Sequence, residues 1–117
     1  MTLSNTDIAT AFSTQRYDEI EQHLAADVFW DLVGGKPRLD RVEVLELLRG
    51  TQENLRELQS TFLEQRVIDG GDTVVVDSVI EYVADDGERS VVSSCDVYEF
   101  EGGLVTHIRS YAGERAF

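Results

Sequence analysis

Cysteine and proline are almost absent from this sequence. The 117-residue chain contains one cysteine, Cys95, and one proline, Pro37. A single cysteine cannot form a disulfide within the chain, and no repeated cysteine and histidine spacing of the kind that builds a zinc site occurs. These absences exclude a fold held together by disulfides or structural metal ions, and the sequence predicts no metal ligands.

Positive charge is also scarce. The chain has 10 Lys and Arg residues against 23 Asp and Glu residues, which gives a formal net charge of -13 at pH 7. The resulting negative field repels polyanions, so nucleic acids and anionic membrane surfaces are excluded as partners. The surplus of carboxylates is typical of an acidic protein that its charge keeps soluble.

Long hydrophobic runs and nucleotide-binding motifs are missing as well. Residues 1–15 have neither a basic start nor a continuous apolar segment, and no apolar run reaches the length of about 18 residues that a membrane span needs. We therefore expect a cytoplasmic protein. The glycine pairs do not form a phosphate-cradling loop or a dinucleotide fingerprint, so we expect no cofactor.

What is present is enough for one folded domain. The chain is 42% hydrophobic, and its length is within the usual range for a single domain. No linker, repeat or low-complexity segment divides it. The sequence thus predicts one domain over residues 1–117.

The first half of the sequence has helical spacing. Ile8, Ala11 and Phe12 recur at helical intervals behind Ser4 or Asn5, either of which is a suitable N-cap. A second helix is predicted at about residues 18–25, and a short strand at 28–33. A third helical stripe runs from about 39 to 58, and Gly50 either interrupts it or is tolerated within it. The stripe consists of Val42, Leu45, Leu48, Leu55 and Leu58.

The second half has the pattern of antiparallel strands. The predicted strands are residues 61–68, 73–83, 91–100 and 104–111, and glycine-containing turns separate them. Helices followed by a meander of long strands indicate an α+β fold, in which the helices cover one face of a curved sheet.

Three segments resemble the nuclear transport factor 2-like superfamily, which includes SnoaL-like polyketide cyclases and ketosteroid isomerase. They are YDEIEQHLAADVFWD at 17–31, GGKPR at 34–38 with the helix after it, and CDVYEFEGGLVTHIRSY at 95–111. The resemblance extends over about residues 5–113. It implies a cone-shaped, cystatin-like α+β barrel that is open at one end and encloses a mostly apolar pocket.

The resemblance also limits the possible functions. Members of the superfamily include cofactor-free isomerases, cyclases and dehydratases as well as pure binding proteins, so the fold alone does not name a reaction. We expect a small pocket protein that either performs acid/base chemistry on a carbonyl-bearing hydrophobic substrate or binds an apolar ligand without changing it. The phenolic donor of the isomerase has no counterpart, because Ile8 falls near its place and Tyr17 lies too far along the chain.

Asp96 is the first candidate for acid/base chemistry. Side chains alternate along a strand, so Asp96 shares a face with Val92, Ser94, Tyr98 and Phe100, which is the more apolar face. A carboxyl on an inward apolar face has a raised pKa and stays protonated more readily. By the resemblance it matches the oxyanion-hole aspartic acid of ketosteroid isomerase, which is a standard example of such tuning. The alternative is an ordinary polar residue on a half-solvated strand.

Asp31 is the second candidate, and its face is ambiguous. By the resemblance, counting back from residues 34–38 places Asp31 at the general-base position, whereas counting forward from Asp27 places Leu32 there. If Asp31 points inward, it and Asp96 share one cavity. If Trp30 and Leu32 point inward, the site is an apolar slot. We favour the second arrangement, because burying Trp30 removes much more apolar surface from water.

His107 is the third candidate. It pairs with Asp96 for acid/base chemistry only if both side chains face inward; otherwise His107 faces outward opposite the apolar Ile108. The outward arrangement is the more ordinary one.

The remaining predictions concern the pocket wall and a dimer. The expected pocket-lining residues are Phe12, Trp30, Leu32, Val76, Ile80, Tyr98, Phe100 and Ile108. Valines dominate the opposite face of the sheet at Val75, Val79, Val83 and Val97. A face so apolar in so acidic a protein predicts a homodimer, and it resembles the dimer interface of the superfamily.

Overall fold

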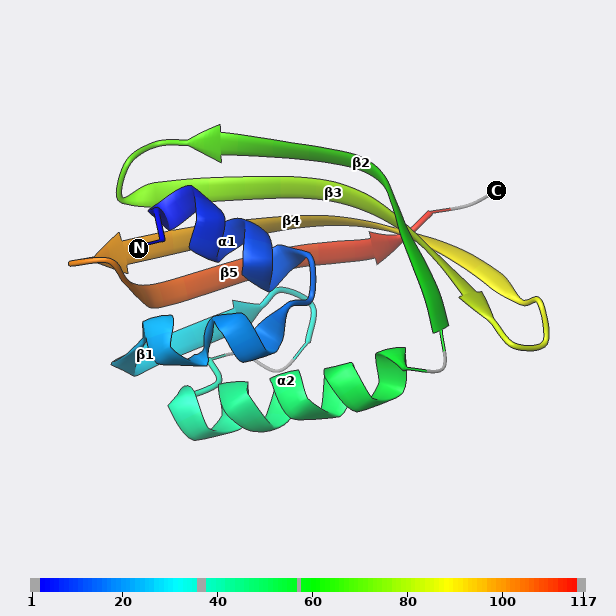
Figure 1. Cartoon of the computed structure of the whole chain (residues 1–117), viewed down its shortest axis with the longest axis horizontal. Helices are drawn as coiled ribbons and strands as arrows, with labels where there is room; N and C mark the ends of the chain where they lie inside the picture. The colour runs from blue at the N-terminus through cyan, green and yellow to red at the C-terminus, as the bar shows by residue number, and fades with distance from the viewer. Residues whose placement is uncertain (1–2, 36–37, 57, 116–117) are drawn as a thin grey trace.

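The fold is an α+β cone in which two α-helices lie against one face of a curved five-stranded sheet (Figure 1). The computed structural model describes residues 3–35, 38–56 and 58–115. Lys36 and Pro37, within the segment that resembles a family loop, lie outside the described residues. The predicted fold class is confirmed.

The N-terminal helix begins where the sequence predicted. Helix α1 spans Asn5–Ser13, and Ser4 is its N-cap. The Ser4 side chain accepts a hydrogen bond from the Asp7 backbone N–H, and the Asp7 side chain accepts one from the Ser4 backbone N–H. This reciprocal arrangement satisfies two backbone donors that would otherwise be left unpaired. Ile8, Ala11 and Phe12 are buried, as their spacing predicts.

The predicted helix at residues 18–25 is wrong. Two short 3-10 turns, η1 (Tyr17–Glu19) and η2 (Glu21–His23), replace it. Ile20 joins them with φ of -115°, which is outside the helical range, and its fully buried side chain fixes this bend against the core. Strand β1 runs from Leu24 to Leu32, so it begins earlier than the strand predicted at residues 28–33.

Helix α2 spans Arg41–Leu55 without interruption, so Gly50 is tolerated within one helix. Val44 and Leu48 are its buried residues, and Leu45 and Leu47 pack half-buried against the core. The predicted stripe is therefore wrong at its two ends. Val42 is 64% exposed, and the chain has already entered the sheet at Leu58.

Four long strands form the antiparallel meander that the sequence predicted. They are β2 (Leu58–Asp69), β3 (Thr73–Ala84), β4 (Arg89–Glu101) and β5 (Leu104–Glu114). The order across the sheet is β1-β5-β4-β3-β2, in which β1 pairs parallel to β5 and every other pair is antiparallel. Strands β1 and β2 are therefore the two edges, and the sheet does not close.

The core lies between the helices and the concave face of the sheet. Helix α1 packs against β3, and α2 packs against β1. Tyr98, Ile108 and Val76 point into this layer and are completely buried, so they define the inner face of the sheet. Residues that alternate with them, such as Val97 and Val75, belong to the outer face.

Alanine substitutions at Gly50 and Gly87 should change the stability of the fold in opposite directions. A Cβ at Gly50 meets no atom within 4 Å, and a helix-interior glycine costs about 1 kcal/mol relative to alanine. We expect Gly50→Ala to raise the free energy of unfolding by about that amount in urea titrations. Gly87→Ala is the control, because its site is equally open but has φ of +86°, so the substitution should destabilise. A loss of stability in Gly50→Ala would contradict the assignment of one continuous helix.

Candidate functional site

Asp96 lies on the inner face of β4, beside the completely buried Tyr98. Its strand partners are Val76 on β3 and Ser110 on β5. Val76 and Tyr98 are fully buried, whereas Asp96 is half-buried. The alternation predicted from the sequence thus places this carboxyl inward.

Hydroxyl groups surround the Asp96 carboxyl. Ser13 Oγ, at the end of α1, donates a hydrogen bond to Asp96 Oδ2 at 2.9 Å. The Ser13 and Tyr98 hydroxyl oxygens are 2.6 Å apart, and this contact is buried. Ser110 also hydrogen-bonds to the carboxyl. Ser13 gives its single hydrogen to Asp96, so Tyr98 donates to Ser13 and supports the carboxyl through it.

Two opposing effects set the proton affinity of Asp96. Burial disfavours the charged form and raises the pKa of Asp96 above its ordinary value, while hydrogen bonds from Ser110, Ser13 and Tyr98 lower that pKa only in part. Burial is the larger effect, so the protonated acid persists to a higher pH than in an exposed aspartate.

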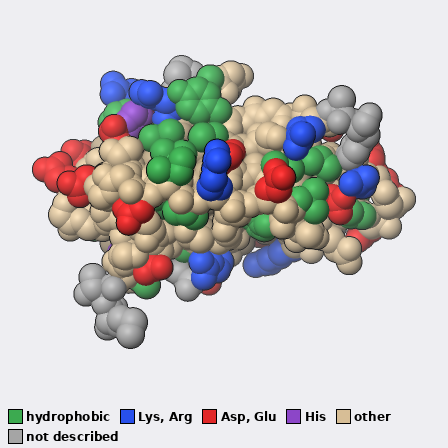
Figure 2. All heavy atoms as spheres, turned by 90° about the horizontal axis from the view of Figure 1, so that it is seen from above, with side chains coloured by type: hydrophobic (Ala, Val, Ile, Leu, Met, Phe, Trp, Pro, Cys, Tyr) green, Lys and Arg blue, Asp and Glu red, His purple; other side chains and the backbone are tan. Residues whose placement is uncertain are grey.

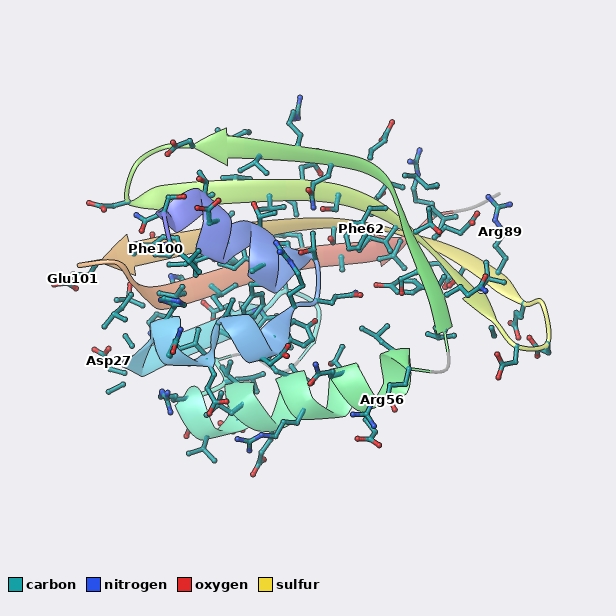
Figure 3. The ribbon with its side chains drawn as sticks, viewed as in Figure 1. Asp27, Arg56, Phe62, Arg89, Phe100 and Glu101 are labelled. Carbon is teal, nitrogen blue, oxygen red and sulfur yellow. The ribbon has the colours of Figure 1, made fainter. Side chains whose placement is uncertain are left out.

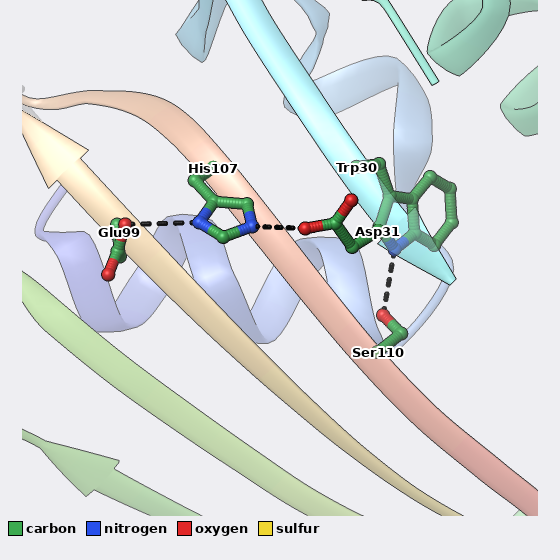
Figure 4. Close-up of polar contacts among 5 residues, drawn as sticks. All are labelled: Trp30, Asp31, Glu99, His107 and Ser110. Carbon is green, nitrogen blue, oxygen red and sulfur yellow. Dashed lines mark hydrogen bonds and ion pairs between the residues drawn. The ribbon is translucent and has the colours of Figure 1, made fainter. Parts of the chain in front are cut away.

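Trp30 determines which group the Ser110 hydroxyl donates to. Its indole Nε1 donates to Ser110 Oγ at 2.8 Å in a buried contact (Figure 4). Because an indole N–H is a donor only, Ser110 accepts from Trp30 and keeps its own O–H for Asp96. The strand pairing of Trp30 with Ile108 places the indole on the inner face, as the sequence favoured.

The charge of Asp96 also acts on two tyrosines, Tyr17 and Tyr82. Burial raises the pKa of Tyr17, and so do the nearby Tyr82 and Asp96 groups. Burial also raises the pKa of Tyr82, although a hydrogen bond from Gln15 lowers it, and the Asp96 charge adds to the rise. Both phenols thus remain protonated around neutral pH.

A hollow of about 250 Å³ opens beside Tyr82, where α2 ends and the β3–β4 hairpin turns, near Arg56 and Arg89 in Figure 3. It is lined by Leu55, Leu58, Tyr82, Ala84, Glu88, Arg89 and Ser90. A larger hollow of about 590 Å³ lies between α1 and β2. Neither hollow is lined by Asp96 or by Ser13, Ser110 and Tyr98.

Asp31 and His107 form a separate cluster on the outer face. His107 Nε2 is 3.0 Å from Asp31 Oδ2, and His107 Nδ1 is 3.1 Å from Glu99 Oε2 (Figure 4). The imidazole stacks on Phe29 at a centroid distance of 4.2 Å, and the Arg38 guanidinium lies over the same phenyl ring. A neutral imidazole has one N–H, so both carboxylate contacts are hydrogen bonds only when the ring is protonated.

The structure therefore separates the three predicted catalytic residues. Asp96 pairs with Ser110 on the inner face, while His107 pairs with Glu99 on the outer face. Asp31 contacts His107, not Asp96. An acid–base pair between Asp96 and either residue would need both on one side of the sheet, and strand alternation prevents this.

The predicted pocket-lining residues lie mainly in the core. Seven of the eight are buried, and Leu32 packs half-buried against them. The eight are Phe12, Trp30, Leu32, Val76, Ile80, Tyr98, Phe100 and Ile108. Their contact with a ligand stays a prediction.

The sequence interpretation missed Ser13, Ser110 and Gln15. Ser13 lies 83 residues before Asp96, and no local pattern connects the two positions. Ser110 had a detectable signal, because it alternates with the apolar Ile108 and therefore shares its face.

The described residues offer neither a metal-binding group nor a membrane-spanning helix. Among those residues, no group of three or more His, Cys, Asp or Glu side chains is arranged to hold a metal ion. No helix in the described part of the chain is both long and apolar enough to cross a membrane.

Comparison with known proteins places this geometry in context. The family model of the SnoaL-like domain matches residues 6–108. No curated protein matches the chain.

Several solved structures share the fold. An NTF2-like protein of unknown function from Cytophaga hutchinsonii has 21% sequence identity and a TM-score of 0.78, with 91% of this chain and 93% of that chain covered. IdmH, a putative polyketide cyclase from Streptomyces antibioticus, has 17% identity and a TM-score of 0.67, covering 88% and 84%. A putative polyketide cyclase from Pseudomonas putida has 12% identity and a TM-score of 0.69, covering 93% and 91%. At these identities the likeness shows the fold alone.

The raised pKa of Asp96 predicts how stability depends on pH. Folding favours the neutral acid of Asp96. The stability that this protonated group contributes is therefore fully present below its unfolded pKa, and it is lost as pH rises through the folded pKa. We expect Asp96→Asn to match or exceed the wild type in free energy of unfolding at neutral pH, and to lose that advantage below the ordinary value of 3.8. Urea titrations at both pH values measure this.

Asp27→Asn is the matched control, because Asp27 is exposed on β1. Its effect on stability should be small at both pH values. A carbon-13 titration that shows Asp96 ionising at or below its ordinary pKa would contradict the prediction.

Proposed function

The chain belongs to the SnoaL-like domain family, and from this premise we propose that it binds a small hydrophobic, carbonyl-bearing ligand and transfers a proton on it. The proposed reaction is that of an isomerase, cyclase or dehydratase that uses general acid/base catalysis without a cofactor. The single observation that carries the proposal is the half-buried Asp96. Burial raises its pKa, and its carboxyl accepts hydrogen bonds from Ser13 and Ser110.

Asp96 can act first as a general base and then as a general acid. In its ionised form it takes a proton from the carbon next to the ligand carbonyl, and the electron pair of the broken C–H bond moves to the carbonyl oxygen. The carboxyl exchanges this proton with solvent and returns a solvent-derived proton to carbon as the carbonyl re-forms. A raised pKa makes the carboxylate a stronger base than an exposed aspartate, which favours the first step.

A binding protein without catalysis is the second candidate. The observation that favours it is the outward position of Asp31 and His107, which leaves Asp96 without the second titratable partner that the sequence suggested. The hydroxyls around Asp96 would then hold a ligand oxygen and change no bond. Binding without proton exchange distinguishes this candidate from the first.

We also propose a homodimer formed through the outer face of the sheet. Ile68, Val75 and Val97 follow one another across β2, β3 and β4. Val79 lies on the same face of β3, with Asp77 between it and Val75. Ile68 is 49% exposed and Tyr111 is 44% exposed in the single chain. Figure 2 shows hydrophobic side chains between acidic and basic ones on the side that it views. A second copy would remove this apolar surface from water.

Hydrogen–deuterium exchange at carbon tests the proposed reaction without knowledge of the natural substrate. The probe is 2-acetonaphthone, a bicyclic ketone whose methyl protons lie next to the carbonyl, followed by proton NMR in deuterated buffer. We expect the wild type to accelerate the exchange and Asp96→Asn to lose about a hundredfold or more of that acceleration. Asp27→Asn should keep the wild-type rate.

Two results would count against catalysis. Binding of the ketone without faster exchange would favour the binding protein. Undiminished exchange in Asp96→Asn would remove Asp96 from the reaction.

The dimer is tested by light scattering at micromolar concentration. We expect a mass of twice 13.1 kDa for the wild type. Val97→Asp should dissociate it, because the substitution places a charge in the proposed interface. Val42→Asp, on the exposed side of α2, is the control and should leave the mass unchanged. A wild-type particle of about 13.1 kDa would rule out the homodimer.

A further inference from the structure

Strand β2 lies at the margin of the sheet and has a free edge (Figure 1). Within the described residues, no other segment pairs with that edge. The opposite margin of the sheet differs, because the Trp30 and Leu39 backbones exchange two hydrogen bonds outside β1, at 2.9 and 2.8 Å. An uncovered strand presents a row of backbone donors and acceptors with which another extended chain can pair.

The hairpin that follows β2 shows which backbone groups point to this edge. The Gly70 N–H donates to the Thr73 carbonyl at 2.9 Å, so these two residues form a hydrogen-bonded pair. Hydrogen-bonded and non-hydrogen-bonded pairs alternate along an antiparallel ladder. The pairs that contain Asp69, Val67 and Gln65 are therefore of the second kind. Their N–H and C=O groups point away from β3, towards the free edge.

A β-bulge sets the length of the available edge. The pairing register of β2 and β3 shifts between Phe62 and Glu64, so Leu63 is an extra residue that has no partner on β3. From Glu64 to Asp69 the register is unbroken. Because a bulge bends its strand and interrupts regular pairing, an incoming chain finds a straight edge only over residues 64–69.

The hollow of about 590 Å³ between α1 and β2 lies beside this edge. Val67 and Asp69 line it from β2, and Thr10 and Ala11 line it from α1. Val67 is 38% exposed, and Leu3, which also lines the hollow, is 37% exposed. Val67 pairs with the buried Val76, so it faces the inner side of the sheet. Inward side chains of a strand added at the edge would therefore enter this hollow.

The charge around the hollow favours a basic chain. Its charged lining residues are Asp7, Asp69 and Arg16, so acidic groups outnumber basic ones. The whole protein has a formal net charge of -13. Complementary charge speeds association and disfavours partners of the same sign, so an acidic chain is a poor occupant.

We propose that the free edge of β2 binds an extended basic peptide of another protein, which joins the sheet as a sixth strand. The backbones of Gln65, Val67 and Asp69 supply the hydrogen bonds, and alternate apolar side chains of the peptide enter the hollow. The basic side chains between them stay in water. The proposed homodimer uses the outer face of the sheet, whereas this site uses the edge and the inner side of β2, so the two are compatible.

A synthetic peptide tests the proposal directly. The probe is a fluorescein-labelled peptide of about six residues in which valine and lysine alternate, matched to the straight edge. We expect saturable binding to the whole protein in fluorescence anisotropy. The same peptide methylated at every backbone nitrogen keeps its side chains but loses its donors, and it should bind at least about tenfold more weakly. A version with glutamate in place of lysine should also bind more weakly.

Two variants of the protein test the edge and the hollow separately. Val67→Pro removes an N–H that points away from β3, which is the kind of position where a sheet tolerates proline. Thr10→Trp fills the hollow and leaves the edge backbone intact. Each should weaken binding by about tenfold or more and keep a cooperative unfolding transition in urea. Asn54→Trp, at an exposed position of α2, is the control for added bulk and should bind as the wild type does.

Each outcome bears on one part of the proposal. Absence of binding to the wild type overturns it, and so does undiminished binding of the methylated peptide or undiminished binding by Val67→Pro. Equal affinity in Thr10→Trp and the wild type removes the hollow from the site. Equal affinity for the glutamate and lysine peptides overturns the preference for a basic partner. A lower particle mass for Val67→Pro in light scattering would identify a second copy as the occupant of the edge and would overturn the proposal too.

Discussion

The alternation of side chains along the adjacent strands β1, β5 and β4 determines on which face of the sheet their polar groups lie. Tyr98 and Ile108 are paired across β4 and β5 and are fully buried. Once these two face the helices, the pair two residues further along, Asp96 and Ser110, must face them too. The residues between belong to the other side, so the carboxyl and the imidazole of His107 cannot meet.

The inner polar site depends on the end of α1 as much as on the sheet. A carboxyl in apolar surroundings destabilises the fold in its charged form unless donors hold it. Ser13 supplies such a donor only because the helix ends there and turns towards β4. Gln15 then adopts its left-handed backbone and reaches β3. The break in the helix thus links a structural need, the pairing of Asp96, to the placement of Tyr82.

The sequence predicted what depends on local spacing and failed where distant contacts decide. The strand meander, the cap at Ser4 and the inward side of Asp96 follow from periods of two and from short capping signals. Residues 18–25 were assigned to a helix because their local pattern permits one, yet burial of Ile20 bends the chain into two turns. Likewise, nothing local connects Trp30 with Ser110, 80 residues later.

Strand β1 shows how the two faces are coupled. It is an edge strand that pairs parallel to β5, with a shift in register between Leu24 and Phe29, so its backbone ladder is irregular. Trp30 bonds to Ser110 on the inner face, and the next residue, Asp31, contacts His107 on the outer face. Consecutive side chains therefore hold β1 to β5 from both sides. Since Ser110 also donates to Asp96, the strand pairing that orders this edge orders the candidate site as well.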